Sequence, residues 1–342
     1  MKRLTIIVTV ILLFAVAVTN VFAVSEAALL FLLISPHARV AGMGEAFVGL
    51  ADDVSAIYYN PAGLAFQQGK QFTSMYVKWL PQFNLSDLYY VFGAYRQSIE
   101  GLGTVAGDIT FLNLGQQTRT NADGFEEGTF NSSEWAITLS YATLLSKTFG
   151  LGINFRFIRS NLSDRGAGAE LGSGKASAFA FDVGILKKNL IVNRLNFGLD
   201  ISNVGPKISY IDDAQADPIP TNFRAGFAYR AVDQEFNKLT FVFDVNKLLV
   251  NRKDDGTPDS VFKAFFSSWG NNDIILNLGG EYWYADLIAL RAGYNHDPDG
   301  NLKYLTFGAG LRYSIYQFDF SYITDKDSAV SNTIRFSLSV GK

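Results

Sequence analysis

Few side chains in this sequence have the type and spacing that an active site or a metal site requires. The chain has no Cys among its 342 residues, which excludes disulfides, Cys-containing zinc sites, iron–sulfur clusters and thiol nucleophiles. His37 and His296 lie far apart, and neither has a His or Cys neighbour at ligand spacing, so we interpret both as ordinary polar residues. No Gly-x-Ser-x-Gly motif of a hydrolase occurs. We therefore expect a protein that is not an enzyme.

Three short acidic or Gly-rich motifs have part of a cofactor or metal pattern. Residues 42–47 (Gly-Met-Gly-Glu-Ala-Phe) begin like a dinucleotide-binding loop but lack the third Gly and follow no strand of a βαβ unit. Residues 297–300 (Asp-Pro-Asp-Gly) could place carboxylates around Ca²⁺, but a Pro-containing turn accounts for them without the rest of an EF-hand loop. The acidic pairs at 212–213 and 254–255 are typical of solvated loops. We expect no cofactor and no bound metal.

The charge balance argues against a nucleic-acid partner. The 29 Lys+Arg and 32 Asp+Glu give a net charge of -3, so there is no overall basic field. Charged residues make up 18% of the chain, below the roughly 25% that is typical of soluble domains. The unusual counts are 31 Gly, 16 Tyr and 29 Phe.

The first residues have the pattern of an export signal. Lys2 and Arg3 precede an apolar run over residues 4–18, and residues 21–23 (Val-Phe-Ala) match a signal-peptidase site, so we interpret 1–23 as a cleaved signal peptide. The alternative is an N-terminal membrane anchor. No later stretch approaches the roughly 20 apolar residues that a membrane helix needs. An exported chain this apolar must either bury its apolar side chains in a core or present them to lipid as strands.

Alternation with a period of two dominates the sequence from residue 72 onward. In the run 149–157, for example, Leu151, Ile153 and Phe155 share one face, while Gly152 and Asn154 share the other. Most runs are close to the roughly 9 to 11 residues of a tilted transmembrane strand. There are fourteen such runs: 72–80, 88–96, 103–113, 133–144, 149–161, 177–187, 195–204, 222–231, 238–247, 273–283, 287–295, 304–314, 316–324 and 332–341.

The connections between these runs favour a barrel over a soluble sandwich. They alternate between long ones, about 14 residues on average, and short ones, about 4.5 on average, which is typical of an outer-membrane barrel with external loops and periplasmic turns. The predicted fold is therefore an all-β, 14-stranded antiparallel transmembrane barrel over residues 72–342, with the lipid bilayer against its apolar face. Its polar face would line the lumen with seven charged side chains: Arg156, Asp200, Arg224, Asp244, Glu281, Arg312 and Asp319.

Residues 24–71 break the alternation. Because fourteen strands enclose more space than their own side chains fill, we expect this segment to fold inside the lumen as a hatch or plug. Asp52 and Asp53 are then expected to pair with lumen arginines such as Arg156. The alternative is that the charged lumen residues line a passage.

The segment resembles a known family. Gly42, Met43 and Gly44, the Ala-Asp-Asp-x-Ser-Ala stretch that contains Asp52 and Asp53, and the turn of Asn60, Pro61 and Ala62 resemble the hatch of FadL-type fatty acid channels. Within that superfamily, residues 33–39 (Leu-Ile-Ser-Pro-His-Ala-Arg), the Trp-Leu pair at 79–80 and residues 157–162 (Phe-Ile-Arg-Ser-Asn-Leu) are similar to the PorV/PorQ family of the type IX secretion system.

The resemblance implies a 14-stranded barrel in the outer membrane of a Gram-negative bacterium. It implies that the protein receives secreted proteins with a C-terminal signal domain and, with other secretion-system components, passes them to surface attachment. The alternative that it implies is a FadL-like transporter of hydrophobic small molecules such as fatty acids. Two features depart from the pattern: the chain ends in Gly341 and Lys342 instead of an aromatic residue, and its loops are short for a FadL-type channel.

The predicted working surface is the set of long external loops, 114–132, 162–176, 205–221 and 248–272. The last loop contains two apolar pairs, Val261 with Phe262 and Phe265 with Phe266. Apolar pairs in a loop that should be polar often mark a binding surface, so we predict a partner-binding loop here. The alternative is that these side chains pack across the barrel mouth.

Overall fold

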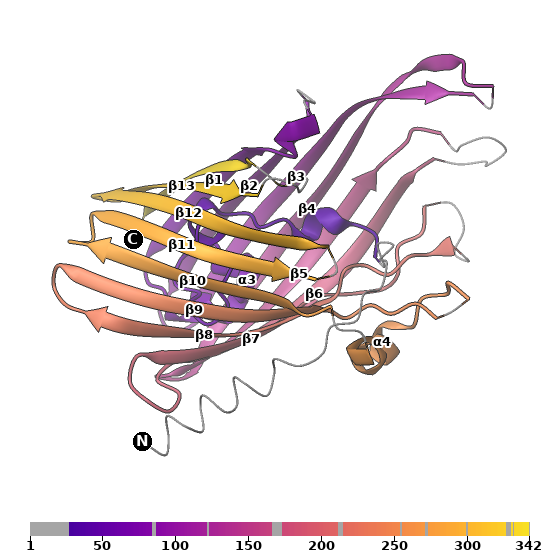
Figure 1. Cartoon of the computed structure of the whole chain (residues 1–342). Coiled ribbons are helices and arrows are strands. Elements are labelled where there is room, and N and C mark those ends of the chain that lie inside the picture. Colours follow the sequence, from indigo (N-terminus) through magenta and orange to yellow (C-terminus); the bar gives the residue numbers. More distant parts are fainter. Residues whose placement is uncertain are drawn as a thin grey trace.

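The computed structural model describes residues 27–83, 87–121, 123–165, 173–210, 215–253, 255–270, 273–298, 300–325, 330 and 332–341 (Figure 1). The predicted signal peptide, residues 1–23, lies outside the described residues. No helix within the described ranges is long and apolar enough to cross a membrane.

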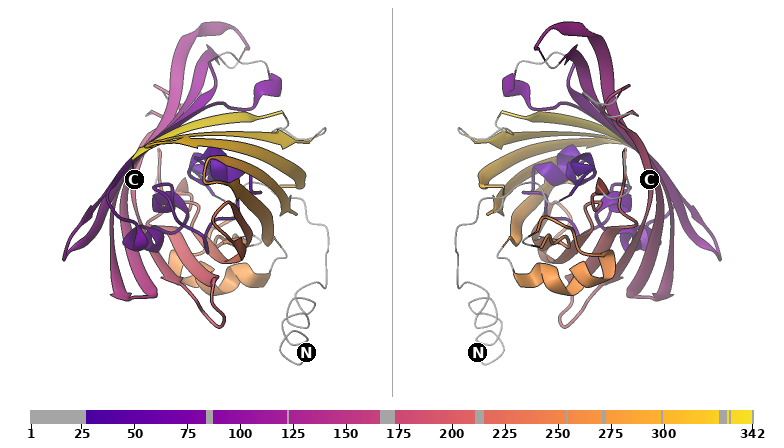
Figure 2. Two further views of the ribbon diagram at one scale, coloured as in Figure 1. Left: turned by 90° about the vertical axis from the view of Figure 1, so that its left-hand side faces the viewer. Right: turned by 90° about the vertical axis from the view of Figure 1, so that its right-hand side faces the viewer.

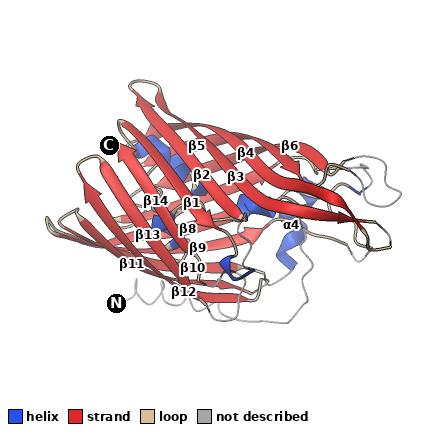
Figure 3. Cartoon of the chain, turned by 90° about the horizontal axis from the view of Figure 1, so that it is seen from above, coloured by secondary structure: helices blue, strands red, loops and turns tan. Residues whose placement is uncertain are grey.

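The described strands form a closed antiparallel barrel (Figures 1 and 3). Each strand pairs with its neighbours in the chain, and β1 closes the ring by pairing with β14, with Phe72 opposite Val340. This confirms the predicted fold class. The fourteen strands are β1 (Lys70–Lys78), β2 (Tyr89–Ile99), β3 (Gly103–Thr120), β4 (Glu126–Ser146), β5 (Phe149–Asn161), β6 (Lys175–Lys187), β7 (Leu195–Val204), β8 (Asn222–Asp233), β9 (Asn237–Leu248), β10 (Ile275–Tyr284), β11 (Ile288–Asp297), β12 (Leu302–Tyr313), β13 (Tyr316–Thr324) and β14 (Ile334–Gly341).

The alternation in sequence is an alternation of barrel faces. On β5, Ile153 and Phe155 are exposed on the outer wall, whereas the alternating residues Asn154 and Arg156 are buried inside. The same pattern repeats along β6. An outer wall of large apolar side chains around a polar interior is what a lipid-exposed barrel requires.

The hairpin of β3 and β4 is longer than the alternation predicts. The loop predicted at 114–132 is wrong, because β3 continues to Thr120, β4 begins at Glu126, and only 121–125 connect them. This hairpin projects beyond the other strands at the upper right of Figure 1. Its outer residues, such as Gln116 and Gln117, are polar on both faces, so they carry no apolar alternation even though they are strands.

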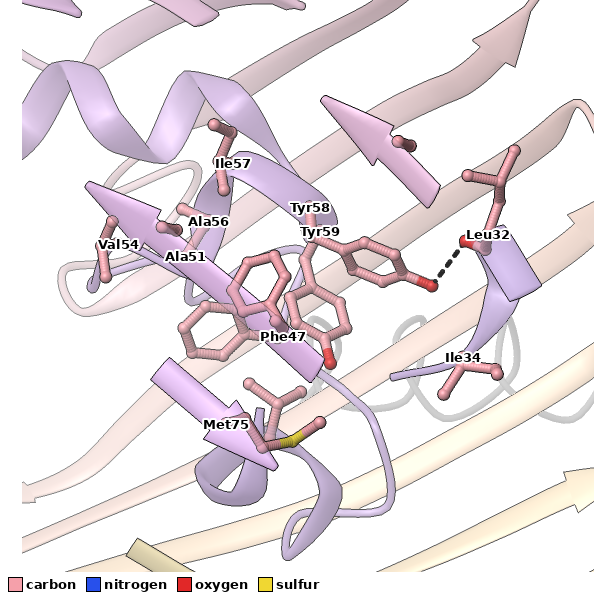
Figure 4. Packing of buried hydrophobic residues seen from close by; sticks show 14 of the residues in the cluster. Leu32, Ile34, Phe47, Ala51, Val54, Ala56, Ile57, Tyr58, Tyr59 and Met75 are labelled. Carbon is pink, nitrogen blue, oxygen red and sulfur yellow. Dashed lines mark hydrogen bonds between the residues drawn. The ribbon is translucent and has the colours of Figure 1, made fainter. Parts of the chain in front are cut away.

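Residues 27–69, called the N-terminal segment below, lie within the ring of strands and are drawn in indigo and purple in Figure 2. They form short helices, and nearly all of their side chains are buried. Figure 4 shows how Phe47, Tyr58 and Tyr59 pack together, with the Tyr58 hydroxyl donating to the Leu32 carbonyl oxygen. The helices of this segment are η1 (Leu30–Leu33), α2 (Ala38–Ala41), α3 (Ala56–Tyr59) and η2 (Pro61–Phe66). Three others, η3 (Pro81–Phe83), α4 (Val261–Ser267) and η5 (Ser268–Gly270), lie in loops between strands.

Candidate functional site

The Gly-Met-Gly residues rest against glycines of the barrel wall. A Cβ on Gly293 of β11 would lie 2.0 Å from the Gly44 nitrogen, and one on Gly279 of β10 would lie 2.2 Å from the Met43 oxygen. Gly44 itself has a φ of +65°, which favours glycine, and its N–H donates to the Thr306 hydroxyl of β12 at 2.9 Å. Glycines on both sides therefore let the segment lie directly on the wall.

The Asn-Pro-Ala turn is seated on the opposite side of the lumen. The Asn60 side chain accepts from the Ala62 N–H at 3.1 Å and donates to the carbonyl oxygens of Val48 and Ile185 at 3.0 and 2.9 Å. A Cβ on Gly152 of β5 would lie 2.3 Å from the Pro61 carbonyl carbon. Asn60 thus caps its own turn and ties it to β6.

Asp52 and Asp53 converge on Arg39, a residue of their own segment. The Arg39 Nη1 atom lies 2.7 Å from a carboxylate oxygen of each, and Nε and Nη2 donate to Glu281 of β10 at 2.8 and 2.7 Å. The expected pairing of these aspartates with a lumen arginine such as Arg156 is wrong: Arg156 binds Asp182 of β6 at 2.9 Å. The arginine that pairs with both aspartates is Arg39, which belongs to the same segment as they do.

Arg39 also determines the ionisation of its neighbour Asp53. Burial raises the pKa of Asp53, but the Arg39 guanidinium, together with His37 and the Ser55 hydroxyl, more than offsets this, so the pKa lies below its ordinary value. On the other side, His37 accepts from the Arg39 N–H and bonds to the Thr73 hydroxyl of β1 at 3.1 Å. The segment is therefore held to the wall by both a charged and a neutral contact.

From Glu281 the ion pairs continue around the wall. Glu281 accepts from Arg291 of β11 at 2.7 Å, and Arg291 lies 2.8 Å from Asp319 of β13. Asp319 then accepts from Gln317, whose side-chain oxygen accepts from Arg312 of β12 at 2.7 Å. The network spans four consecutive strands and has Arg39 at its inner end.

Two further predicted lumen residues, Asp244 and Arg224, also hold the N-terminal segment. Asp244 of β9 accepts from the N–H groups of Phe47 and Val48 at 2.5 and 2.8 Å. Arg224 of β8 donates to the Tyr58 carbonyl oxygen at 2.9 Å and lies 3.7 Å from Asp200. The alternation in sequence places these side chains on the inner face but does not identify their backbone partners.

The candidate partner-binding residues form α4, which lies beside the wall at the end that carries the long loops (Figure 1). Phe262 and Phe266 are 84% and 85% exposed, whereas Val261 and Phe265 are half-buried. Nearby, Trp269 packs edge-on against Phe223 of β8, with ring centroids 5.6 Å apart. Phe262 and Phe266 therefore do not pack across the barrel mouth.

Asp259 fixes the start of α4. Its carboxylate accepts from Lys263 at 2.7 Å and from Asn251 and Ser267 at 2.8 Å each. These three bonds, and above all the one from Lys263, hold the pKa of Asp259 well below its ordinary value.

The described residues include no group of three or more His, Asp or Glu side chains arranged to hold a metal ion.

Comparison with known proteins gives one family and one fold. The family model described as type IX secretion system protein PorV matches residues 18–255, and no curated protein matches. The Pseudomonas putida toluene transporter TodX is 14% identical, with 95% of this chain and 98% of that chain covered and a TM-score of 0.55. A Pseudomonas aeruginosa FadL homologue is 14% identical (90% and 98% covered, TM-score 0.53), and the Ralstonia pickettii toluene transporter TbuX is 11% identical (90% and 98%, 0.52). At these identities the likeness shows the fold alone.

Proposed function

The chain belongs to the PorV family of type IX secretion system proteins, and on this premise we propose that it serves protein secretion at the outer membrane. In this role it receives secreted proteins that carry a C-terminal signal domain and passes them to surface attachment, together with other components of the system. The barrel carries out no catalytic step itself.

The observation that carries this proposal is the exposed apolar face of α4. Phe262 and Phe266 lie one helical turn apart, at the end of the barrel where the long loops are. A group of large apolar side chains that are highly exposed often marks a surface that binds another protein. In our proposal this face contacts the incoming signal domain.

The anchored N-terminal segment supports a role in which the cargo does not pass through this lumen. Arg39, Asn60 and the Phe47 backbone bind three separate parts of the wall. Moving the segment aside would separate a buried ion pair and expose its unpaired charges, which is costly. Cargo that stays on the outer surface needs no such displacement.

The test replaces both exposed phenylalanines, giving Phe262→Ser with Phe266→Ser. We expect surface-attached proteins with a C-terminal signal domain to fall severalfold in a surface proteome, with the barrel present at its normal level. Phe125→Ser is the matched control, because Phe125 is 70% exposed at the tip of the β3–β4 hairpin. A normal surface proteome in the double variant would contradict the role of α4.

A second candidate function is the transport of hydrophobic small molecules such as fatty acids. One feature of the wall favours it. Strand β6 pairs with β7 only from Phe181 onward, so residues 175–180 pair with β5 alone. This leaves a gap in the backbone hydrogen bonds between β6 and β7 at the loop end of the barrel. A lateral exit for an apolar molecule needs such a gap. Deleting the gene and comparing the surface proteome with uptake of labelled fatty acid separates the two functions, because impaired uptake with normal secretion favours transport.

A further inference from the structure

A shallow groove lies on the outer wall of the barrel, away from the N-terminal segment and from α4. It occupies about 600 Å³ across the outer parts of β4, β5 and β6. The side chains that line it are Asn131, Ser133, Trp135, Phe157, Arg159, Asn161, Lys175 and Ser177.

The strand register places this groove at a boundary of polarity. Residues that are paired across β4, β5 and β6 form rows on the lipid-facing surface. The two rows nearest the loop end are polar or cationic, apart from Trp135. The rows below them are wholly apolar and belong to the exposed belt, with Leu139 63% and Phe181 55% exposed. Read from β4 to β6, the rows are Ser133, Asn161, Lys175; Trp135, Arg159, Ser177; Ile137, Phe157, Phe179; and Leu139, Phe155, Phe181.

The charged side chains of the groove are both cations. Arg159 donates from Nη1 to the Ser177 hydroxyl at 2.9 Å and from Nε to the Asn161 side chain at 3.2 Å, which fixes the plane of its guanidinium. A guanidinium has five N–H donors, so three remain for a ligand. Lys175 lies one row further out, and no carboxylate is among the described lining residues.

A ring pair marks the lower edge of the groove. Trp135 and Phe157 meet edge-to-face with centroids 5.6 Å apart, Trp135 in the second polar row and Phe157 in the first apolar row below it. Tryptophan at this level is typical of the boundary between headgroups and acyl chains. A ligand with an anionic head and apolar tails would therefore meet matching surfaces at both ends.

We propose that this groove binds the phosphate-bearing headgroup of an amphiphile in the outer leaflet of the outer membrane. Arg159 and Lys175 contact the phosphate, because a fixed guanidinium matches its oxygens and a lysine adds a second positive charge. The serine and asparagine side chains supply further polar contacts, and the acyl chains lie along the apolar rows. Continuity with the lipid-facing belt favours a lipid over a soluble anion.

The test measures binding of lipid A that carries two phosphates to the purified full chain in detergent, by native mass spectrometry. We expect the double variant Arg159→Gln with Lys175→Gln to bind about tenfold more weakly, since two charge-assisted contacts are lost. The matched control, Lys78→Gln with Lys303→Gln, removes two exposed lysines near the outer ends of β1 and β12 and should bind as the unchanged protein does.

Two further measurements need no variant. The unchanged protein should bind dephosphorylated lipid A about tenfold more weakly than the phosphorylated form. Inorganic phosphate at millimolar concentration should not displace the lipid. Equal binding of both lipid forms, equal binding by the double variant, or displacement by inorganic phosphate would each overturn the proposal.

Discussion

Arg39 joins the N-terminal segment to the wall through a buried ion pair with Glu281. Its buried guanidinium pairs with Asp52, Asp53 and Glu281, so Arg39→Ala leaves Asp52 and Asp53 without their cation and leaves Glu281 with Arg291 alone. Removing one partner of a buried ion pair typically costs about 3 to 5 kcal/mol. We expect the free energy of unfolding in detergent micelles to fall by about that amount, as measured by urea denaturation followed by tryptophan fluorescence.

An exposed ion pair provides the control for this prediction. Arg119 and Asp164 pair at the outer end of the β3–β4 hairpin, where water screens them. Arg119→Ala should therefore change the free energy of unfolding by at most about 1 kcal/mol. If both variants lose the same small amount, Arg39 is not the anchor that its contacts indicate.

The protonation of His37 gives a pH dependence with a definite sign. Burial lowers the pKa of His37, and the nearby Asp53 and Asp319 only partly offset this. The folded state therefore binds the proton less readily than the unfolded chain, so stability falls as the pH drops from about 6.5 towards the folded pKa. His37→Asn keeps an acceptor for the Arg39 N–H and should flatten the change in urea midpoint between pH 8 and pH 5.5. An unaltered pH dependence would assign it to other groups.

At the scale of elements, the inward glycines of the wall determine whether the N-terminal segment can lie in place. In Gly152→Ala the new methyl group would overlap the Pro61 and Ala62 backbone, which must move. We expect Ala56→Cys, fully buried on α3 and the only cysteine in the chain, to react faster with a maleimide when Gly152→Ala is also present.

Gly93→Ala on β2 tests whether this effect is specific. A Cβ there would lie 3.7 Å from the Ile109 side chain, an ordinary contact distance. The labelling rate of Ala56→Cys should stay unchanged in that background. Equal acceleration by both glycine variants would show that the barrel as a whole is loosened.

A strand can be predicted from the sequence where its two faces meet different surroundings, because its side chains then alternate in hydropathy. The strand β5 was predicted at 149–161 and lies there, because one of its faces meets lipid and the other the polar interior. The outer parts of β3 and β4 were missed because both of their faces are polar. Backbone pairing holds these parts together, and it leaves no signature in side-chain hydropathy.

The contacts of the N-terminal segment were predictable only in part, for a similar reason. The short motifs around Gly42 and Asn60 identify residues that meet the wall but not the wall residue that each one meets, and the Asp52 motif binds Arg39 of its own segment instead. Arg39 is the only arginine between residues 24 and 71, and this was the one available signal that the two aspartates have a local partner. The exposure of Phe262 and Phe266 depends on how α4 is turned, which composition does not encode.

At the scale of the whole molecule, the apolar side chains of the outer wall require lipid or detergent around the barrel. Exposed apolar side chains such as Leu139, Phe181 and Phe307 are distributed around the ring, far beyond the patch that a water-soluble monomer tolerates. The interior carries the buried ion pairs instead. A charge introduced on this apolar outer surface should therefore destabilise the barrel more, the deeper it lies in the bilayer.

Leu139→Arg tests this dependence near the middle of the apolar rows of β4. An arginine on the lipid face near the bilayer midplane costs about 2 to 4 kcal/mol, so folding of the variant into phospholipid vesicles should be less favourable by that amount. Phe125→Arg, at the tip of the β3–β4 hairpin, introduces the same charge outside the apolar belt and should cost little. Folding is followed by the shift between folded and heat-denatured bands on electrophoresis. If the two variants fold equally well, Leu139 does not face the hydrocarbon, and the rows that place the Arg159 groove at the lipid boundary must be reassigned.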